Sequence, residues 1–105
     1  MDKTTSELES ATNVGSPTFA ARIRERDAEA LEEVVRRYLP HILRAARGAG
    51  LAQQLAEDVA QDTFVTFVET APRFEGRSHV RTWLFGILYK KISAARRSRA
   101  RDDEM

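Results

Sequence analysis

Apolar side chains recur every three or four positions along most of this chain, a spacing that predicts amphipathic helices. Asp27 is placed to cap one such helix, and the run at 48–50 is typical of a helix end. Pro40 lies inside the pattern, and its ring crowds the carbonyl of Arg36, so we expect it to bend or split the helix. The apolar positions are Leu31, Val34, Val35, Tyr38, Leu39, Ile42, Leu43 and Ala46.

A shorter helix is predicted before this one and a longer helix after it. Ser16 and Pro17 are a typical helix start, and the short helix would end near residue 26 with Phe19, Ala20 and Ile23 facing inward. The third helix spans about 52–70 and ends at Pro72; its β-rich run at 65–68 also allows a strand, but the longer period favours a helix. Its stripe is Leu55, Val59, Phe64, Phe67 and Val68, with Ala56, Ala60 and Val65 beside it.

The fourth predicted helix spans about 79–99, with Ser78 as its N-cap. The residues Val80, Trp83, Leu84, Ile87, Leu88 and Ile92 share one face. With no internal repeat and no hairpin signal, the predicted fold class is all-α, a compact bundle of about four helices over 17–100. Residues 1–16 are predicted to be a flexible N-terminal tail, and 101–105 a frayed end where a linker would start.

Length and composition limit the class of protein. One domain is expected from 105 residues, and the absence of cysteine excludes disulfides and thiolate chemistry. The N-terminus lacks the apolar core of a secretory signal, and no apolar run is long enough to span a membrane. We therefore expect a cytoplasmic protein without membrane insertion.

Charge is strongly segregated although the net charge is only +1. Residues 51–72 hold Glu57, Asp58, Asp62 and Glu69 and no Lys or Arg. Residues 73–101 hold nine basic residues, and Glu75 is their only acid. Adjacent helices of opposite charge can hold one basic and one polyanionic partner, which predicts an adaptor between a protein and a nucleic acid.

The sequence contains few residue patterns that are typical of an enzyme active site. Carboxylates four apart on one helix, such as Asp58 and Asp62, could do acid–base work or bind a metal. However, His41 and His79 lie in other segments, and no Gly-rich phosphate loop or nucleophile setting is present. We expect no enzyme, no cofactor and no metal, and we interpret the carboxylates as a solvated or protein-binding face.

The connection at 73–78 and the helix after it carry the candidate nucleic-acid chemistry. An aromatic ring, a flexible glycine and two guanidinium groups suit single-stranded nucleic acid, although an ordinary connection with Phe74 filling the core remains an alternative. In the next helix, Trp83 and Phe85 point about 200° apart, so one should be partly exposed, and we expect Phe85. Acidic lipid or a partner protein are alternative targets for this basic helix.

These residues resemble a known family. The run Ala56-Glu57-Asp58-Val59-Ala60-Gln61-Asp62-Thr63-Phe64 resembles region 2.2 of bacterial sigma factors, and 73–85 resembles regions 2.3 and 2.4, most closely those of the extracytoplasmic-function group. The resemblance implies that Glu57, Asp58, Gln61 and Asp62 bind the clamp helices of the largest subunit of core RNA polymerase.

The resemblance also implies a DNA site. The loop at 73–78 would capture an extruded base of the single-stranded non-template −10 promoter element, with the following helix beside it. The implied DNA-binding residues are Arg73, Phe74, Glu75, Gly76, Arg77, Ser78, His79, Arg81, Thr82, Trp83, Phe85, Tyr89, Lys90 and Lys91. An anti-sigma factor is an expected partner, and a protein-interaction module with incidental DNA binding is the alternative function.

Two departures from the family pattern stand out. The family commonly has Asn near Lys90 and Asp near Ala94, so the detail of base readout is expected to differ here. Family members also carry a second helical domain, region 4, whereas this chain stops at Met105. The resemblance therefore implies a region 2 module or a fragment of a longer protein.

Overall fold

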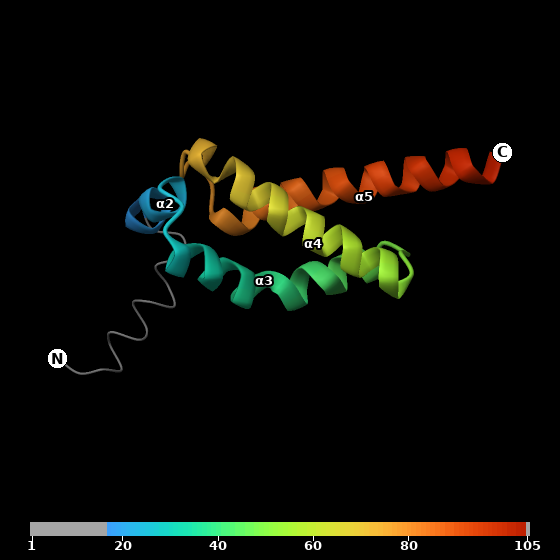
Figure 1. Ribbon diagram of the computed structural model, residues 1–105, viewed down its shortest axis with the longest axis horizontal. Coiled ribbons are helices and arrows are strands. Elements are labelled where there is room, and N and C mark those ends of the chain that lie inside the picture. Colours follow the sequence, from blue (N-terminus) through green and yellow to red (C-terminus); the bar gives the residue numbers. More distant parts are fainter. Residues whose placement is uncertain (1–16, 105) are drawn as a thin grey trace.

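The computed structural model describes residues 17–104, which form a helical bundle (Figure 1). The elements are α2 (Pro17–Arg24), α3 (Ala28–Gly48), α4 (Gln53–Thr70), the 3₁₀ turn η2 (Ala71–Arg73) and α5 (Val80–Glu104). The predicted all-α class with four helices is confirmed for this part of the chain. The predicted tail at 1–16, with Ser16 as a cap, lies outside the described residues.

The sequence at the start of α3 explains its position in the bundle. Asp27 is the N-cap, and its carboxylate accepts hydrogen bonds from the Ala30 N–H at 3.1 Å and from Arg22 Nη2 at 2.7 Å. Pro40 lies within a continuous helix, so it does not split α3, and Figure 1 shows that α3 follows a curved axis. Every fourth residue is buried, namely Ala30, Val34, Tyr38, Ile42 and Ala46.

The middle helix α4 packs against both α3 and α5. It is helical through 65–68, so the strand alternative is wrong. Thr63 is a core residue that hydrophobic periodicity missed; its hydroxyl donates to the Val59 carbonyl at 2.7 Å, which satisfies its polar group within the helix. Val65, beside the predicted stripe, is 47% exposed.

The last helix buries Val80, Leu84, Leu88 and Ile92, as its apolar spacing predicts. Ser78 does not cap it: the helix begins at Val80, and His79 Nδ1 accepts from the Arg81 N–H at 3.1 Å. Residues 101–104, where a frayed end was expected, continue the helix in this structure. No Gly or Pro interrupts residues 87–104, so nothing local stops the helix, which projects beyond the bundle (Figure 1).

A tight turn joins α2 to α3 and ties both to the far end of α4. The short helix ends at Arg24, two residues before the predicted end. Arg26 adopts a left-handed conformation with φ 55°. Its guanidinium donates to the carbonyls of Val68 at 3.1 Å and Glu69 at 2.9 Å, which satisfies two acceptors at the C-terminal end of α4.

Asp27 should make the stability of the bundle sensitive to acid. The hydrogen bond from Arg22, and then that from the Ala30 N–H, lower the pKa of Asp27 below its ordinary value of 3.8. Because the folded pKa lies below the unfolded one, this contribution is complete above the ordinary value and is lost as the pH falls through the lowered one. Asp27→Asn should therefore lose less stability than wild type between neutral pH and pH 3, measured as urea midpoints. Equal losses in the two proteins would contradict this.

Candidate nucleic-acid interface

The connection between η2 and α5 is exposed except at its first residue. Phe74 is 4% exposed, and its ring lies 5.2 Å from that of Trp83, centroid to centroid. Phe74 therefore fills the core, as the ordinary-connection alternative describes, and little of its ring is exposed in this structure. Residues 75–79 are all exposed, and Arg77 Nε lies 3.1 Å from Glu75 Oε1.

The backbone of this connection requires a glycine. Gly76 has φ +78°, a left-handed conformation that side chains with a Cβ adopt at a cost. A Cβ at this position would also lie 3.0 Å from the Ala20 Cβ of α2, closer than ordinary van der Waals contact. The course of the loop is thus set by its glycine and by the helix beneath it.

The predicted DNA-binding residues of α5 fall on two different faces. One is a ladder at four-residue spacing, in which the Arg81 guanidinium carbon lies 5.1 Å from the Phe85 ring and the rings of Phe85 and Tyr89 are 6.0 Å apart. Thr82 and Tyr89 are exposed, and Phe85 is half-buried. Phe85 is therefore partly exposed, as expected. Trp83 is half-buried as well, so both rings are partly accessible.

The other face of α5 borders a concavity of about 480 Å³ against α4. It gathers four of the predicted residues, Arg73, Trp83, Lys90 and Lys91. The Trp83 ring also lies 5.7 Å from the buried Phe67 ring, so the indole has aromatic support from the core. The remaining lining residues are Thr66, Thr70, Ile87 and Ala94.

Sequence reasoning missed Thr66 and Thr70 because they lie on α4, outside the basic run. The Thr70 hydroxyl donates to the Thr66 carbonyl at 2.7 Å, which leaves its oxygen able to accept. Their four-residue spacing on a predicted helix was the available signal. Chemically, the concavity combines three cations, an aromatic ring and hydroxyl groups, a set that can hold phosphates and a flat base.

The four predicted acidic-face residues are all exposed, but they form two stripes. Glu57 and Gln61 border the α3 side, where Gln53 Nε2 donates to Glu57 at 3.3 Å. Asp58 and Asp62 border the α5 side. Asp62 Oδ2 lies 3.0 Å from Lys91 Nζ, so one ion pair joins the acidic and basic helices.

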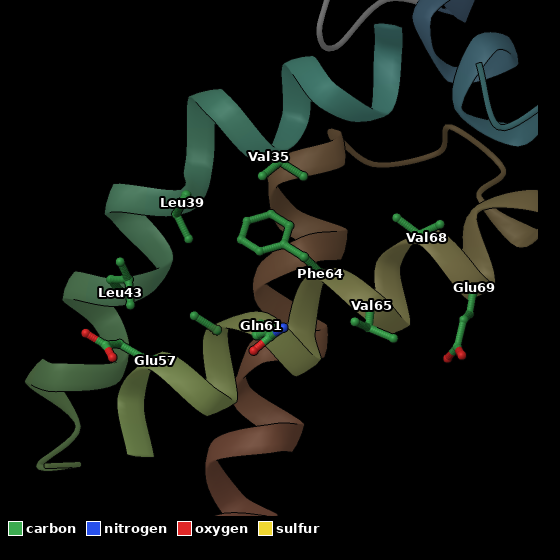
Figure 2. Close-up of a pocket in the computed structure, with 10 residues that line it drawn as sticks. Val35, Leu39, Leu43, Glu57, Gln61, Phe64, Val65, Val68 and Glu69 are labelled. Atoms are coloured by element: carbon green, nitrogen blue, oxygen red, sulfur yellow. The ribbon is translucent and has the colours of Figure 1, made fainter. Parts of the chain in front are cut away.

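Between α3 and α4 runs an apolar groove of about 720 Å³ (Figure 2). Leu39 is 38% exposed on one wall and Val65 is 47% exposed on the other. Figure 2 shows Glu57 and Glu69 near its two ends. The other lining residues are Val35, Leu43, Ala60, Gln61, Phe64 and Val68. Polar contacts are scarce along its walls, so the groove suits an apolar segment of a protein.

Among residues 17–104, no three His, Cys, Asp or Glu residues cluster as ligands for a metal ion. None of the helices described there is long and apolar enough to cross a membrane.

Comparison with known proteins identifies the family. Residues 34–102 match the model of sigma-70 region 2, so the chain belongs to the sigma-70 region 2 family. The chain is 31% identical over 81 residues to the RNA polymerase sigma factor NccH of Alcaligenes xylosoxydans xylosoxydans, covering 77% of this chain and 44% of the relative. It is 34% identical over 67 residues to the RNA polymerase sigma factor YlaC of Bacillus subtilis (strain 168), covering 64% of this chain and 38% of the relative.

The chain thus spans less than half the length of these curated relatives. No solved structure matched it. The resemblance drawn from the motifs is confirmed at the level of the family, which is non-enzymatic, in agreement with the expectation from the residues.

Two glycines should respond oppositely to alanine. Gly76→Ala places a Cβ in a left-handed conformation against Ala20 and should cost roughly 1 kcal/mol or more. Gly86→Ala lies within α5 with no atom within 4 Å of the new Cβ, and should gain roughly 0.5–1 kcal/mol through helix propensity. Urea unfolding of both variants checks this. Equal effects at the two sites would show that the loop accepts a side chain.

Proposed function

We propose that this chain is the region 2 module of an extracytoplasmic-function sigma factor, which joins core RNA polymerase to the −10 promoter element in the cytoplasm. The observation that supports this most directly is the exposed pair Asp58 and Asp62 on α4, beside a concavity lined by Arg73, Lys90 and Lys91. Sigma-70 region 2 membership and the names of the two relatives support the same assignment.

The polymerase side of the proposal uses the exposed residues of α4. Glu57, Asp58, Gln61 and Asp62 offer carboxylates and an amide to a cationic surface, for which we propose the clamp helices of the largest polymerase subunit. Exposed charges of one sign speed encounter with an oppositely charged partner and fix its orientation. Asp62 would exchange its Lys91 partner for a polymerase cation, at small cost because exposed ion pairs are weak.

The DNA side of the proposal uses the loop at 75–79 and the concavity. Arg77, Arg73 and the two lysines would hold phosphates of the non-template strand, and the accessible part of Trp83 would stack on an extruded base. Phe74 would support the indole from the core side. Holding an unpaired base better than a paired one offsets an extrusion cost of a few kcal/mol. The ladder of Arg81, Phe85 and Tyr89, with Thr82, would meet the neighbouring duplex.

Arg77→Ala should weaken binding to single-stranded non-template −10 DNA. Loss of one phosphate contact should lower the salt slope of log K by about 0.7 and reduce the preference for this strand over its complement. Arg37→Ala is the matched control, because it removes one exposed arginine from α3, forty positions away from Arg77 in the sequence. Fluorescence anisotropy at several salt concentrations gives both quantities. If Arg77→Ala and wild type keep the same slope and preference, the loop is not part of the DNA site.

An anti-sigma factor is the second candidate partner, because the apolar groove between α3 and α4 suits a protein helix. Its floor is apolar, and Glu57 and Glu69 lie near its ends, so an amphipathic helix with terminal cations fits it. In this alternative the groove is the main functional surface, and DNA binding is incidental.

Asp58→Lys should show whether polymerase binds the acidic face of α4 or the apolar groove. Placing a like charge against a cationic clamp should weaken binding to core RNA polymerase by roughly tenfold or more. Leu39→Ser, in the wall of the groove, should leave that binding near wild type. Pull-down titration with core enzyme measures both variants. The reverse result, with only Leu39→Ser impaired, would favour the groove as the main docking surface.

A further inference from the structure

The short helix α2 lies directly beneath the exposed loop. Arg24 Nη1 donates to the Phe74 carbonyl at 3.3 Å, across fifty positions of sequence. The Gly76 backbone lies so close to α2 that a Cβ at this position would be 3.0 Å from the Ala20 Cβ. We propose that α2 is a support for the DNA-binding loop, with Arg24 and Ala20 as positioning residues. The DNA part of this inference rests on the proposed function.

The support is itself firmly held. Phe19, Ala20 and Ile23 are 4%, 5% and 0% exposed, so one face of α2 is part of the core. At its C-terminal end, Arg22 pairs with the cap residue Asp27, and Arg26 binds the last carbonyls of α4. A helix fixed to α3 and α4 in this way can act as a rigid support for an exposed connection.

The loop has little support of its own. Within residues 75–79, the ion pairs and hydrogen bonds are the exposed Arg77–Glu75 pair and the bonds from the Arg81 and Trp83 N–H groups to His79. An exposed pair of this kind adds little rigidity. At its start the loop is held at Phe74, whose N–H donates to the Ala71 carbonyl and whose carbonyl accepts from Arg24, and at Gly76, which lies against Ala20. Phe74 and Gly76 therefore both contact α2.

A chain of contacts connects α2 to the candidate DNA site. Arg24 binds the carbonyl of Phe74, and the ring of Phe74 packs on Trp83, which lines the concavity. Loss of the Arg24 hydrogen bond should free the Phe74 peptide and change the surroundings of the indole. Trp83 is the only tryptophan in the chain, so its emission reports this packing directly.

Arg24 is exposed, so a direct phosphate contact is the competing explanation of any effect on DNA binding. The two roles differ in the free protein. A positioning residue alters the loop and the emission of Trp83 before DNA is added. A phosphate contact alters only DNA affinity and its salt slope.

The experiment compares Arg24→Met, Arg24→Lys and the control Arg37→Met. Arg24→Met keeps an unbranched, flexible side chain, although a shorter one, and removes both the donors and the positive charge. Three properties are measured: Trp83 emission in the free protein, amide hydrogen exchange at 75–79, and the preference for non-template −10 DNA. Urea unfolding checks that the bundle remains folded. Arg24→Met should shift the emission, speed exchange in the loop and reduce strand preference roughly fivefold, the size of one lost hydrogen bond.

Arg24→Lys keeps a donor and should recover part of each change, while Arg37→Met should match wild type. Unchanged emission and loop exchange in Arg24→Met would overturn the positioning role, even if DNA affinity falls. Absence of strand preference in the wild type would instead contradict the proposed function. The emission and exchange measurements would still decide the role of α2 in that case.

Discussion

Close packing of α4 between α3 and α5 is the constraint on which the rest of this structure depends. Ala56, Ala60 and Thr63 are small and at most 1% exposed, and they allow neighbouring helices to approach, while Phe67 fills the centre. Two sides of α4 are therefore occupied. The remaining side carries the exposed carboxylates, with the apolar groove on its α3 border and the basic concavity on its α5 border.

This arrangement makes the acidic and basic surfaces neighbours on one helix rather than separate regions. Asp62 and Lys91 meet across the α4–α5 boundary, and both side chains are partly exposed. Such pairs contribute little to stability, so either partner can exchange them at small cost. In the proposed function, polymerase binding to Asp62 and DNA binding to Lys91 are then compatible and physically adjacent.

The helices were predictable because their cores repeat every four residues, as at Val80, Leu84, Leu88 and Ile92. The ends of the helices were harder to predict. His79 rather than Ser78 supplies the cap of α5, and α5 continues through 101–104 because no residue there breaks it. Composition placed Phe74 among candidate stacking residues, yet its ring is in the core, since an aromatic beside a turn can point either way.

The amino-acid sequence alone determined the helical class, the opposite charges of α4 and α5, and the motifs that identify the family. These follow from local periodicity and from residue types, which need no knowledge of distant neighbours. Only the tertiary structure decided that Trp83, Lys90 and Lys91 share a concavity with Thr66 and Thr70, and that Arg24 reaches Phe74. Those contacts depend on how helices cross and rotate against each other, which is set by side-chain packing across the whole core.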